Sequence, residues 1–188
     1  MLIEKKIIER QLHTASKEGN TEEVIRLMSS LKVDVNSMTE YHSWNQSTPL
    51  IEAADNGHND VVELLLEAGA AVNIGDKYGI TPLIWAALNG NIDMVKLLLN
   101  AGAEIDRADD KGMTPLQEAA REGLDDVVQL LIDAGADVDG ADKGGFTSLH
   151  KAAMNGHREV VKVILDAGAE VDKADLGGKT PLHMASGR

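Results

Sequence analysis

The sequence predicts an all-α solenoid, a curved stack of helix-turn-helix units joined by β-turn or hairpin fingers. Four Thr-Pro-Leu segments and one Thr-Ser-Leu recur, each 33 residues after the last, and begin at Thr48, Thr81, Thr114, Thr147 and Thr180. Glycines repeat with the same step in two series, which are Gly57, Gly90, Gly123 and Gly156, and Gly69, Gly102, Gly135 and Gly168. A unit of this length cannot bury its apolar face alone, so the fixed period indicates units that stack on their neighbours.

The composition is typical of thin helices that pack closely. Of 188 residues, 43% are hydrophobic but only 3% are aromatic, so we expect a core of Ala, Leu, Val and Ile. The 18 basic and 31 acidic residues give a net charge of −13. This argues against nucleic acid as a ligand, because phosphate binding requires Lys and Arg to displace counterions. It favours a protein partner that is basic or polar.

We expect an intracellular, cytoplasmic monomer with no membrane insertion. Charged residues interrupt the first ten positions, and no apolar stretch approaches the length of a membrane span. There is no cysteine, so no disulfide framework is available. Asn45-Gln46-Ser47 matches a glycosylation sequon, which we attribute to chance because no secretion signal accompanies it.

Residues 1–18 predict a first helix longer than its later counterparts, as expected of a cap that shields the end of an array. Its apolar residues are spaced for one helix face, and they are Ile3, Ile7, Ile8, Leu12 and Ala15. The unit that this helix begins carries five extra residues. Four of them fall between residues 36 and 48, in a loop that holds Tyr41, His42 and Trp44.

In each later unit a threonine stands where a helix N-cap belongs, with proline at the first helical position. Ser148 replaces this proline in one unit, which we expect to cost little. Alanine pairs at 53–54, 86–87, 119–120 and 152–153 permit close helix contact. The first glycine series then suits a left-handed stop to the helix.

Apolar runs such as residues 61–66 predict a second helix in each unit, which the second glycine series ends. We expect short extended pieces, such as residues 72–73 and 138–139, to lead into tight turns. In these turns an aspartate precedes a glycine by three residues, as at 76–79.

The order of these features resembles the ankyrin repeat. Thr180-Pro181-Leu182-His183-Met184-Ala185 matches its signature, and Gly57-His58 and Gly156-His157 match the loop between its helices. We divide the chain into a capping unit at 1–40, full units at 41–73, 74–106, 107–139 and 140–172, and a truncated unit at 173–188. Because the next glycine of the series is due at position 189, we expect a fragment of a longer array.

The resemblance implies a right-handed curved stack, whose concave groove and fingers bind a protein partner. It also implies a structural role for His150 and His183, as hydrogen-bond partners of the backbone near the turn.

The residues predict no enzyme, no cofactor and no metal site. Gly178-Lys179-Thr180 is similar to the end of a phosphate-binding loop, but the glycine required five residues earlier is Lys173. The histidines have no third ligand at helical spacing, and the Asp125-Asp126 pair has no pocket-forming context. The motifs Gly-x-Ser-x-Gly and His-Glu-x-x-His do not occur.

Positions that vary between units are free to specify a partner. Before the threonines, Ile80, Met113 and Phe146 form an apolar stripe that the stack does not need. Before the alanine pairs stand Trp85, Glu118 and Lys151. The other candidates lie at finger tips and first-helix ends, and they are Tyr78, Lys111, Leu88, Asn89, Arg121 and Met154. An exposed Trp and Tyr among apolar neighbours are typical of a binding hot spot, although packing of Trp85 on an adjacent helix is the alternative.

Two functional hypotheses follow. The first is a non-enzymatic interaction module, and the second is a scaffold fragment of a larger multidomain signalling, channel or host-directed effector protein whose activity lies elsewhere. Asn73 also resembles the asparagine that is hydroxylated in some ankyrin arrays. The alternative for Asn73 is an asparagine that only stabilises the turn.

Overall fold

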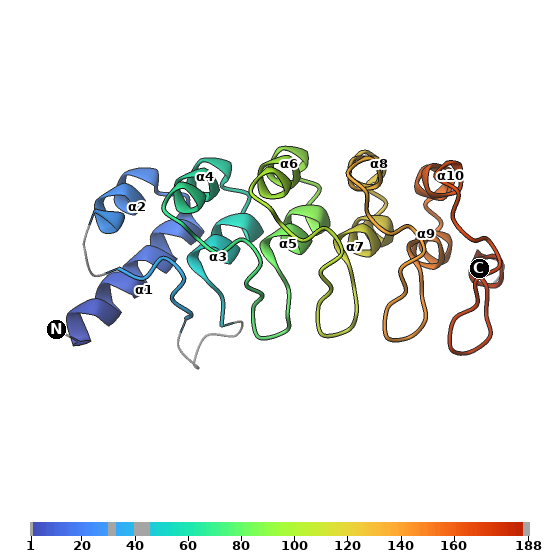
Figure 1. The fold of residues 1–188 in the computed structure, drawn as a ribbon, viewed down its shortest axis with the longest axis horizontal. Coiled ribbons are helices and arrows are strands. Elements are labelled where there is room, and N and C mark those ends of the chain that lie inside the picture. The colour runs from blue at the N-terminus through green and yellow to red at the C-terminus, as the bar shows by residue number, and fades with distance from the viewer. Residues whose placement is uncertain (1, 30–32, 40–45, 186–188) are drawn as a thin grey trace.

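The computed structural model describes residues 2–29, 33–39 and 46–185, and in this part of the chain eleven helices stack in two layers (Figure 1). The first helices of the units are α1 (Leu2–Glu18), α3 (Pro49–Asp55), α5 (Pro82–Leu88), α7 (Pro115–Glu122), α9 (Ser148–Asn155) and α11 (Pro181–Ala185). The second helices are α2 (Thr21–Met28), α4 (Asn59–Glu67), α6 (Ile92–Asn100), α8 (Asp125–Asp133) and α10 (Arg158–Asp166). The predicted all-α repeat solenoid is confirmed.

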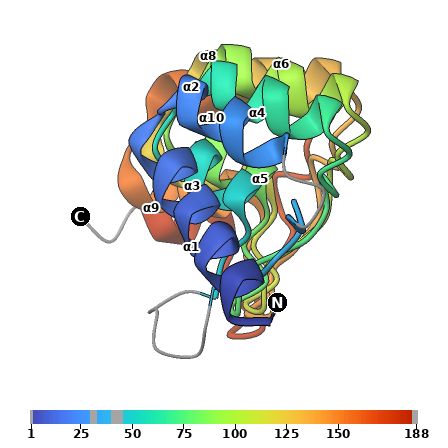
Figure 2. The ribbon, with the colours of Figure 1, turned by 90° about the vertical axis from the view of Figure 1, so that its left-hand side faces the viewer.

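Viewed along the stack, the second helices form one layer, the first helices lie beneath them, and the fingers extend away from both (Figure 2). The loop with Tyr41, His42 and Trp44 lies outside the described residues. No helix in the described ranges is both long and apolar enough to cross a membrane.

Threonine caps begin the first helices as the sequence predicts. The Oγ1 atoms of Thr48, Thr81 and Thr114 each accept from the amide three residues on, at 3.3 Å, and Thr147 does so at 3.4 Å. Each threonine has extended backbone dihedrals, so the chain turns into the helix at this residue.

Helix α1 has 17 residues, against seven or eight in α3, α5, α7 and α9. Its greater length is confirmed, but its apolar face is only partly buried. Leu12 and Ala15 belong to the core, whereas Ile3 is 75% exposed and Ile7 is 52% exposed. The reason is that the first turns of α1 extend past the end of the stack, away from α3 (Figure 1).

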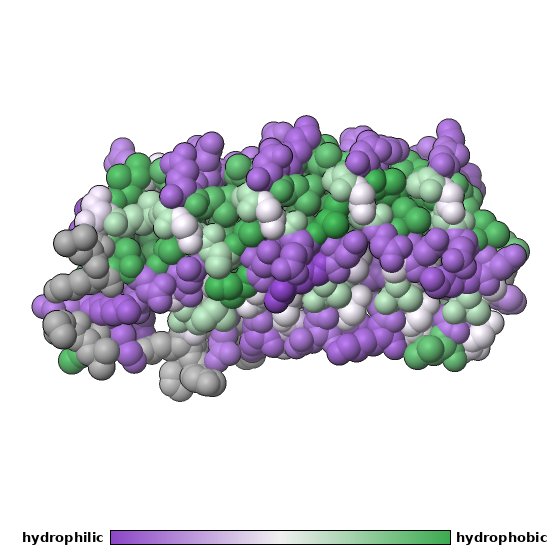
Figure 3. Space-filling view, viewed as in Figure 1, coloured by the Kyte–Doolittle hydropathy of each residue, from purple (hydrophilic) through white to green (hydrophobic). Residues whose placement is uncertain are grey.

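One continuous core runs through the stack and consists of aliphatic side chains, alanines and Met94. Both alanines of the pairs in α3, α5 and α7 are fully buried, as close contact between neighbouring first helices requires. On the face shown in Figure 3, partly buried hydrophobic side chains form a band over the layer of second helices, between hydrophilic rows.

The fingers are held by turns, and the described residues contain no named strand, only an isolated bridge between Ala141 and Thr147. In the first regular finger, the Asp76 amide donates to Ile80 O at 3.0 Å, and the Gly79 amide donates to Asp76 O at 2.9 Å. The expectation of extended pieces at 72–73 and 138–139 is wrong, because both lie in turns. The side chains at these turns bond to the next unit, which fixes them there.

Candidate interaction surface

We define the inner face as the surface formed by the fingers and the sides of the first helices that contact them. Each regular unit places its finger aspartate nine positions before a residue of the first helix. The clearest case joins Asp142 to Lys151 of α9, whose Nζ lies 2.6 Å from Oδ2 of the carboxylate. The equivalent pairs are Asp76 with Trp85 and Asp109 with Glu118.

Finger tips provide the most exposed candidates. Tyr78 is 50% exposed, and Nζ of Lys77 lies 4.8 Å from the centre of its ring. Lys111 is exposed as well, while Ile80 is half-buried. Lys143 is exposed at the next tip, so the tips present one aromatic ring and three ammonium groups to solvent.

The candidate role of Trp85 assumes an exposed side chain, and the structure differs from this expectation. Trp85 is half-buried and packs against the core, and its indole Nε1 is buried with no hydrogen-bond partner among the described residues. Leu88 is also half-buried. Asn89 is exposed, but its Nδ2 donates to the carbonyl oxygen of Asp55 at 2.8 Å, which links α5 to α3. Asn89 therefore contributes to the stack as well as to the surface.

The expected apolar stripe is interrupted, because Met113 is only 4% exposed. Glu118 is only 7% exposed, contrary to its expected place on the surface. Both belong to the unit of α7, which packs against α5 on one side and α9 on the other. Met113 and Glu118 are thus corrected from surface candidates to buried residues.

Arg121 lies above Glu118, with Nη2 of the guanidinium 2.8 Å from Oε2 of the carboxylate, and it also pairs with Glu122 at 2.9 Å. Burial raises the pKa of Glu118. The charge of Arg121 opposes this rise, whereas those of Asp109 and Glu122 add to it. The centre of the inner face is therefore a cluster of carboxylates with one guanidinium.

Phe146 and Lys151 form a cluster of their own in the next unit. Nζ of Lys151 lies 4.8 Å from the centre of the Phe146 ring, and this ring meets His150 edge-on at 5.8 Å. Burial alone would raise the pKa of Asp142. The hydrogen bonds from Lys151 and from the Phe146 and Gly144 amides outweigh burial and lower it. Met154, at the end of α9, is 36% exposed.

Asn73 bonds to the following unit. Its Oδ1 accepts from the Glu104 amide at 2.9 Å, and its Nδ2 donates to the carbonyl oxygen of Gly102 at 3.3 Å. Asp139 makes the equivalent contact with the Glu170 amide at 2.9 Å. The side chain thus has a structural role, and hydroxylation of Asn73 stays a prediction.

Two histidine roles agree with the resemblance. In α9, Nδ1 of His150 accepts from the Thr147 amide at 3.1 Å, and Nε2 donates to the carbonyl oxygen of Lys179 at 3.0 Å. At the last turn, Nδ1 of His183 accepts from the Thr180 amide at 3.2 Å. These are structural contacts with backbone. Within the described ranges, no group of three or more His, Asp or Glu side chains is arranged to hold a metal ion.

Gln117 was overlooked in the sequence although it is fully buried. Its Nε2 donates to the carbonyl oxygens of Gly140 and Phe146, both at 2.9 Å, and its Oε1 accepts from the Thr114 amide at 3.1 Å. The signal was present, because threonine followed three residues later by glutamine is the sequence pattern of a capping box.

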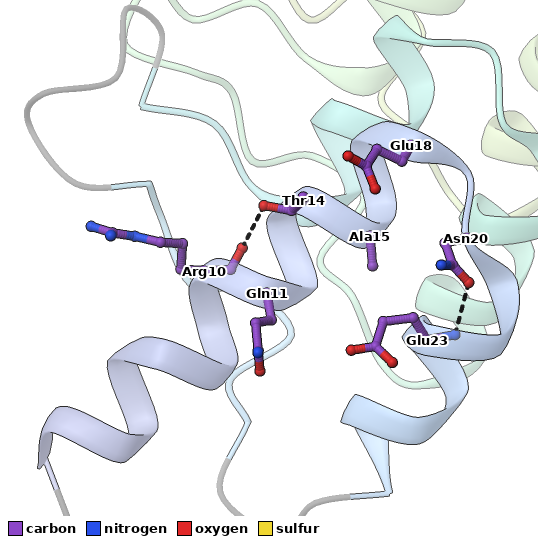
Figure 4. A pocket seen from close by; sticks show the side chains of 7 residues that line it. All are labelled: Arg10, Gln11, Thr14, Ala15, Glu18, Asn20 and Glu23. Atoms are coloured by element: carbon purple, nitrogen blue, oxygen red, sulfur yellow. Dashed lines mark hydrogen bonds between the residues drawn. The ribbon is translucent and has the colours of Figure 1, made fainter.

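A shallow hollow of about 400 Å³ lies at the other end of the molecule, between α1 and the start of α2 (Figure 4). Within it, Oγ1 of Thr14 donates to the carbonyl oxygen of Arg10 at 3.1 Å, and the Glu23 amide donates to Oδ1 of Asn20 at 3.0 Å. Both bonds are local to a helix or its cap. The hollow therefore gives no reason to move the candidate surface away from the inner face.

The fold and the inner face define a helical-repeat solenoid that displays turns and first helices along one side. The family model described as ankyrin repeats (3 copies) matches residues 12–109, 72–142, 106–175 and 140–188. The chain belongs to the ankyrin repeat family, whose members are generally protein–protein interaction modules. No curated protein matches the chain.

Proposed function

We propose that this chain is a non-enzymatic module that binds a protein partner on its inner face. The observation that carries the proposal is the way the fingers are joined. The Asp110 amide donates to Tyr78 O at 2.8 Å, and the Lys143 amide donates to Lys111 O at 3.0 Å. Each finger is thus bonded to its neighbour through backbone.

A partner gains from this arrangement because the surface is already ordered before binding. The fingers present Tyr78 and Lys111 on backbone that is bonded to a neighbouring finger, so little conformational entropy is lost on association. The net charge of −13 supports a basic partner, since opposite charge speeds encounter. In this proposal the chain acts as an intracellular monomer.

The test begins with a partner selected from a displayed-protein library with this chain as bait. Trp85→Ala combined with Phe146→Ala should abolish capture of that partner and leave the helical circular dichroism signal intact. Tyr78→Ala, at a residue that is 50% exposed, should weaken capture without any effect on folding.

The matched control combines Ile25→Ala with Val171→Ala. These residues are 50% and 52% exposed, and they lie on α2 and in the loop after α10, away from the inner face. The control should bind as the wild type does. Undiminished capture by the Trp85 and Phe146 double variant would refute the proposed surface.

A further inference from the structure

The finger aspartates Asp76, Asp109 and Asp142 accept the same backbone hydrogen bonds. They differ in which side chain, if any, offsets the negative charge of the carboxylate. Oδ1 of Asp142 accepts from the amides of Gly144 and Phe146, at 2.8 and 2.9 Å. Its other oxygen, Oδ2, is occupied by Nζ of Lys151 at 2.6 Å, beside the Phe146 ring. In this unit the carboxylate therefore has a lysine ammonium supplied by its own chain.

Asp76 has the same finger geometry without the ammonium. Its Oδ1 accepts from the amides of Tyr78 and Ile80, at 2.8 and 3.0 Å. The residue is only 6% exposed, and its Oδ2 is buried with no hydrogen-bond partner among the described residues. Trp85 stands here at the position of Lys151. Its indole N–H is also buried without a hydrogen-bond partner among the described residues. A buried carboxylate oxygen and a buried N–H without partners are both costly, so this part of the inner face is incomplete.

Asp109 repeats the arrangement in the next unit. Its Oδ1 accepts from the Lys111 and Met113 amides, both at 2.8 Å. The position of the lysine is taken by Glu118, so that two carboxylates lie where the following unit has an ion pair. Arg121 offsets part of this charge through its contacts with Glu118 and Glu122.

The charge of the inner face changes along the stack as a result. Helices α3 and α7 and the turns at 76–79 and 109–112 carry seven acidic residues and three basic ones. Helix α9 and the turn at 142–145 carry one acidic residue and two basic ones. Burial raises the pKa of Asp55, Asp76 and Glu118, and in each case a neighbouring carboxylate adds to the rise. A cation placed among them would relieve this repulsion.

We propose that the inner face binds a lysine-rich segment of a protein partner, with one ammonium between Asp76 and Trp85 and a second between Asp109 and Glu118. Each ammonium of the partner binds its finger carboxylate in the way that Nζ of Lys151 binds the carboxylate of Asp142. The inference rests on the proposed function and names the chemistry of the partner. Trp85 contributes the aromatic face, which attracts an ammonium through its ring electrons.

Entry at Asp76 requires a local rearrangement, because its Oδ2 is buried in the free protein. Trp85 is the half-buried side chain that the repeat places at the position of Lys151, so its indole must turn as the ammonium enters. The environment of the Trp85 indole N–H therefore reports directly on binding.

The spacing of the units fixes the spacing of the lysines. Helices packed side by side lie roughly 8–10 Å apart, which sets the distance between neighbouring units. A polyproline II segment rises about 3.1 Å per residue with three residues per turn, so residues three apart lie on one side about 9 Å apart. A peptide with lysine at every third position in a Pro/Gln background has this geometry.

The probe is that peptide, twelve residues long, and its control has glutamine in place of every lysine. Two-dimensional ¹H–¹⁵N NMR of the full chain follows the indole N–H resonances, and Trp44→Phe assigns the signal of Trp85. The lysine peptide should shift the Trp85 resonance in a saturable way, with an affinity that falls as salt is added. The glutamine peptide should leave it unmoved.

Asparagine substitutions remove the charge and keep the Oδ1 acceptor of each finger. Asp76→Asn combined with Asp109→Asn should weaken binding of the lysine peptide about tenfold or more, from two lost ion pairs. Asp60→Asn combined with Asp93→Asn is the charge-matched control, since both residues are exposed in the first turns of the second helices α4 and α6. It should bind as the wild type does.

Lys151→Gln gives a test in the opposite direction. The substitution removes the ammonium from Asp142, so that a third finger carboxylate is free to bind a lysine of the peptide. A peptide with lysine at every third position should then bind about threefold more tightly or better. Equal shifts with the lysine and glutamine peptides, or undiminished binding by the double asparagine variant, would overturn the inference. If that variant also keeps the library partner while Trp85→Ala with Phe146→Ala loses it, the inner face binds a protein by other chemistry and the proposed function stands.

Discussion

The imidazole of His157 lies directly against Gly123, and its Nε2 donates to the carbonyl oxygen of Arg121 at 2.9 Å. The loop after α9 is thereby joined to the end of α7, one unit earlier. Gly123 has φ +80°, and a Cβ built on it would lie 2.5 Å from Nδ1 of His157. Gly123 is required for two reasons: its φ is in the left-handed region, and the His157 ring occupies the space that a Cβ atom would need.

Gly123→Ala should therefore lower the free energy of unfolding by about 2 kcal/mol, the sum of left-handed strain and a displaced hydrogen bond. Gly135→Ala is the matched control. It has φ +95° but nothing within 4 Å of the added Cβ, so it should cost only about 1 kcal/mol. Urea denaturation of both variants measures the difference, and equal losses would contradict the role given to His157.

Gln117→Ile should destabilise the protein by about 2 kcal/mol, although Ile51 and Ile84 occupy the equivalent positions in the preceding units. The substitution leaves the Gly140 carbonyl oxygen and the Thr114 amide without their partner. Gln117→His should recover part of the loss, because His150 makes the same cap and donates to Lys179 O, the equivalent of Phe146 O. Thermal unfolding of both variants tests this, and a neutral Gln117→Ile would count against it.

Ser148→Pro should stabilise the protein by about 0.5–1 kcal/mol, through lower entropy of the unfolded chain. Thr147 already has the extended dihedrals that proline requires of its predecessor, and they nearly match those of Thr114 before Pro115. The change also removes the Ser148 hydroxyl, which is buried with no partner among the described residues. Calorimetry should show a rise in Tm of a few degrees, and the reverse change, Pro115→Ser, a fall.

Glu118→Gln should make the protein more stable than the wild type at pH 7. The pKa of Glu118 is raised in the fold, so its favourable contribution is present below its ordinary value of 4.5 and is lost as pH rises through the raised pKa. The advantage of the glutamine variant should accordingly disappear in denaturation series below about pH 4.5. An advantage that persists unchanged at low pH would show that burial of the charge is not its cause.

Lys151→Met should show the opposite dependence. The pKa of Asp142 is lowered, so its contribution is present above its ordinary value of 3.8 and is lost as pH falls through the lowered pKa. The variant should be less stable than the wild type at pH 7, and the two should converge in acid. Denaturation at a series of pH values measures the stability of both Lys151→Met and Glu118→Gln.

The sequence by itself determined the repeat and the boundaries of its helices. Threonine caps, proline at the first helical position and left-handed glycines act within a few residues, so Thr81 and Gly90 reveal their roles without any neighbour. The capping box of Gln117 is also a local pattern, whereas its bonds to the Gly140 and Phe146 carbonyl oxygens depend on the next finger.

Only the tertiary structure decided which of the variable residues reach solvent. Met113 and Glu118 occupy positions that vary between units, yet packing between α5 and α9 buries both. Lys151 stands in the same register as Trp85, but one bonds to a finger carboxylate and the other leaves it unpaired. A period of 33 residues fixes the place of a side chain within its unit. The exposure and the partners of that side chain depend on contacts with the units on either side. The repeat period carries no information about these contacts.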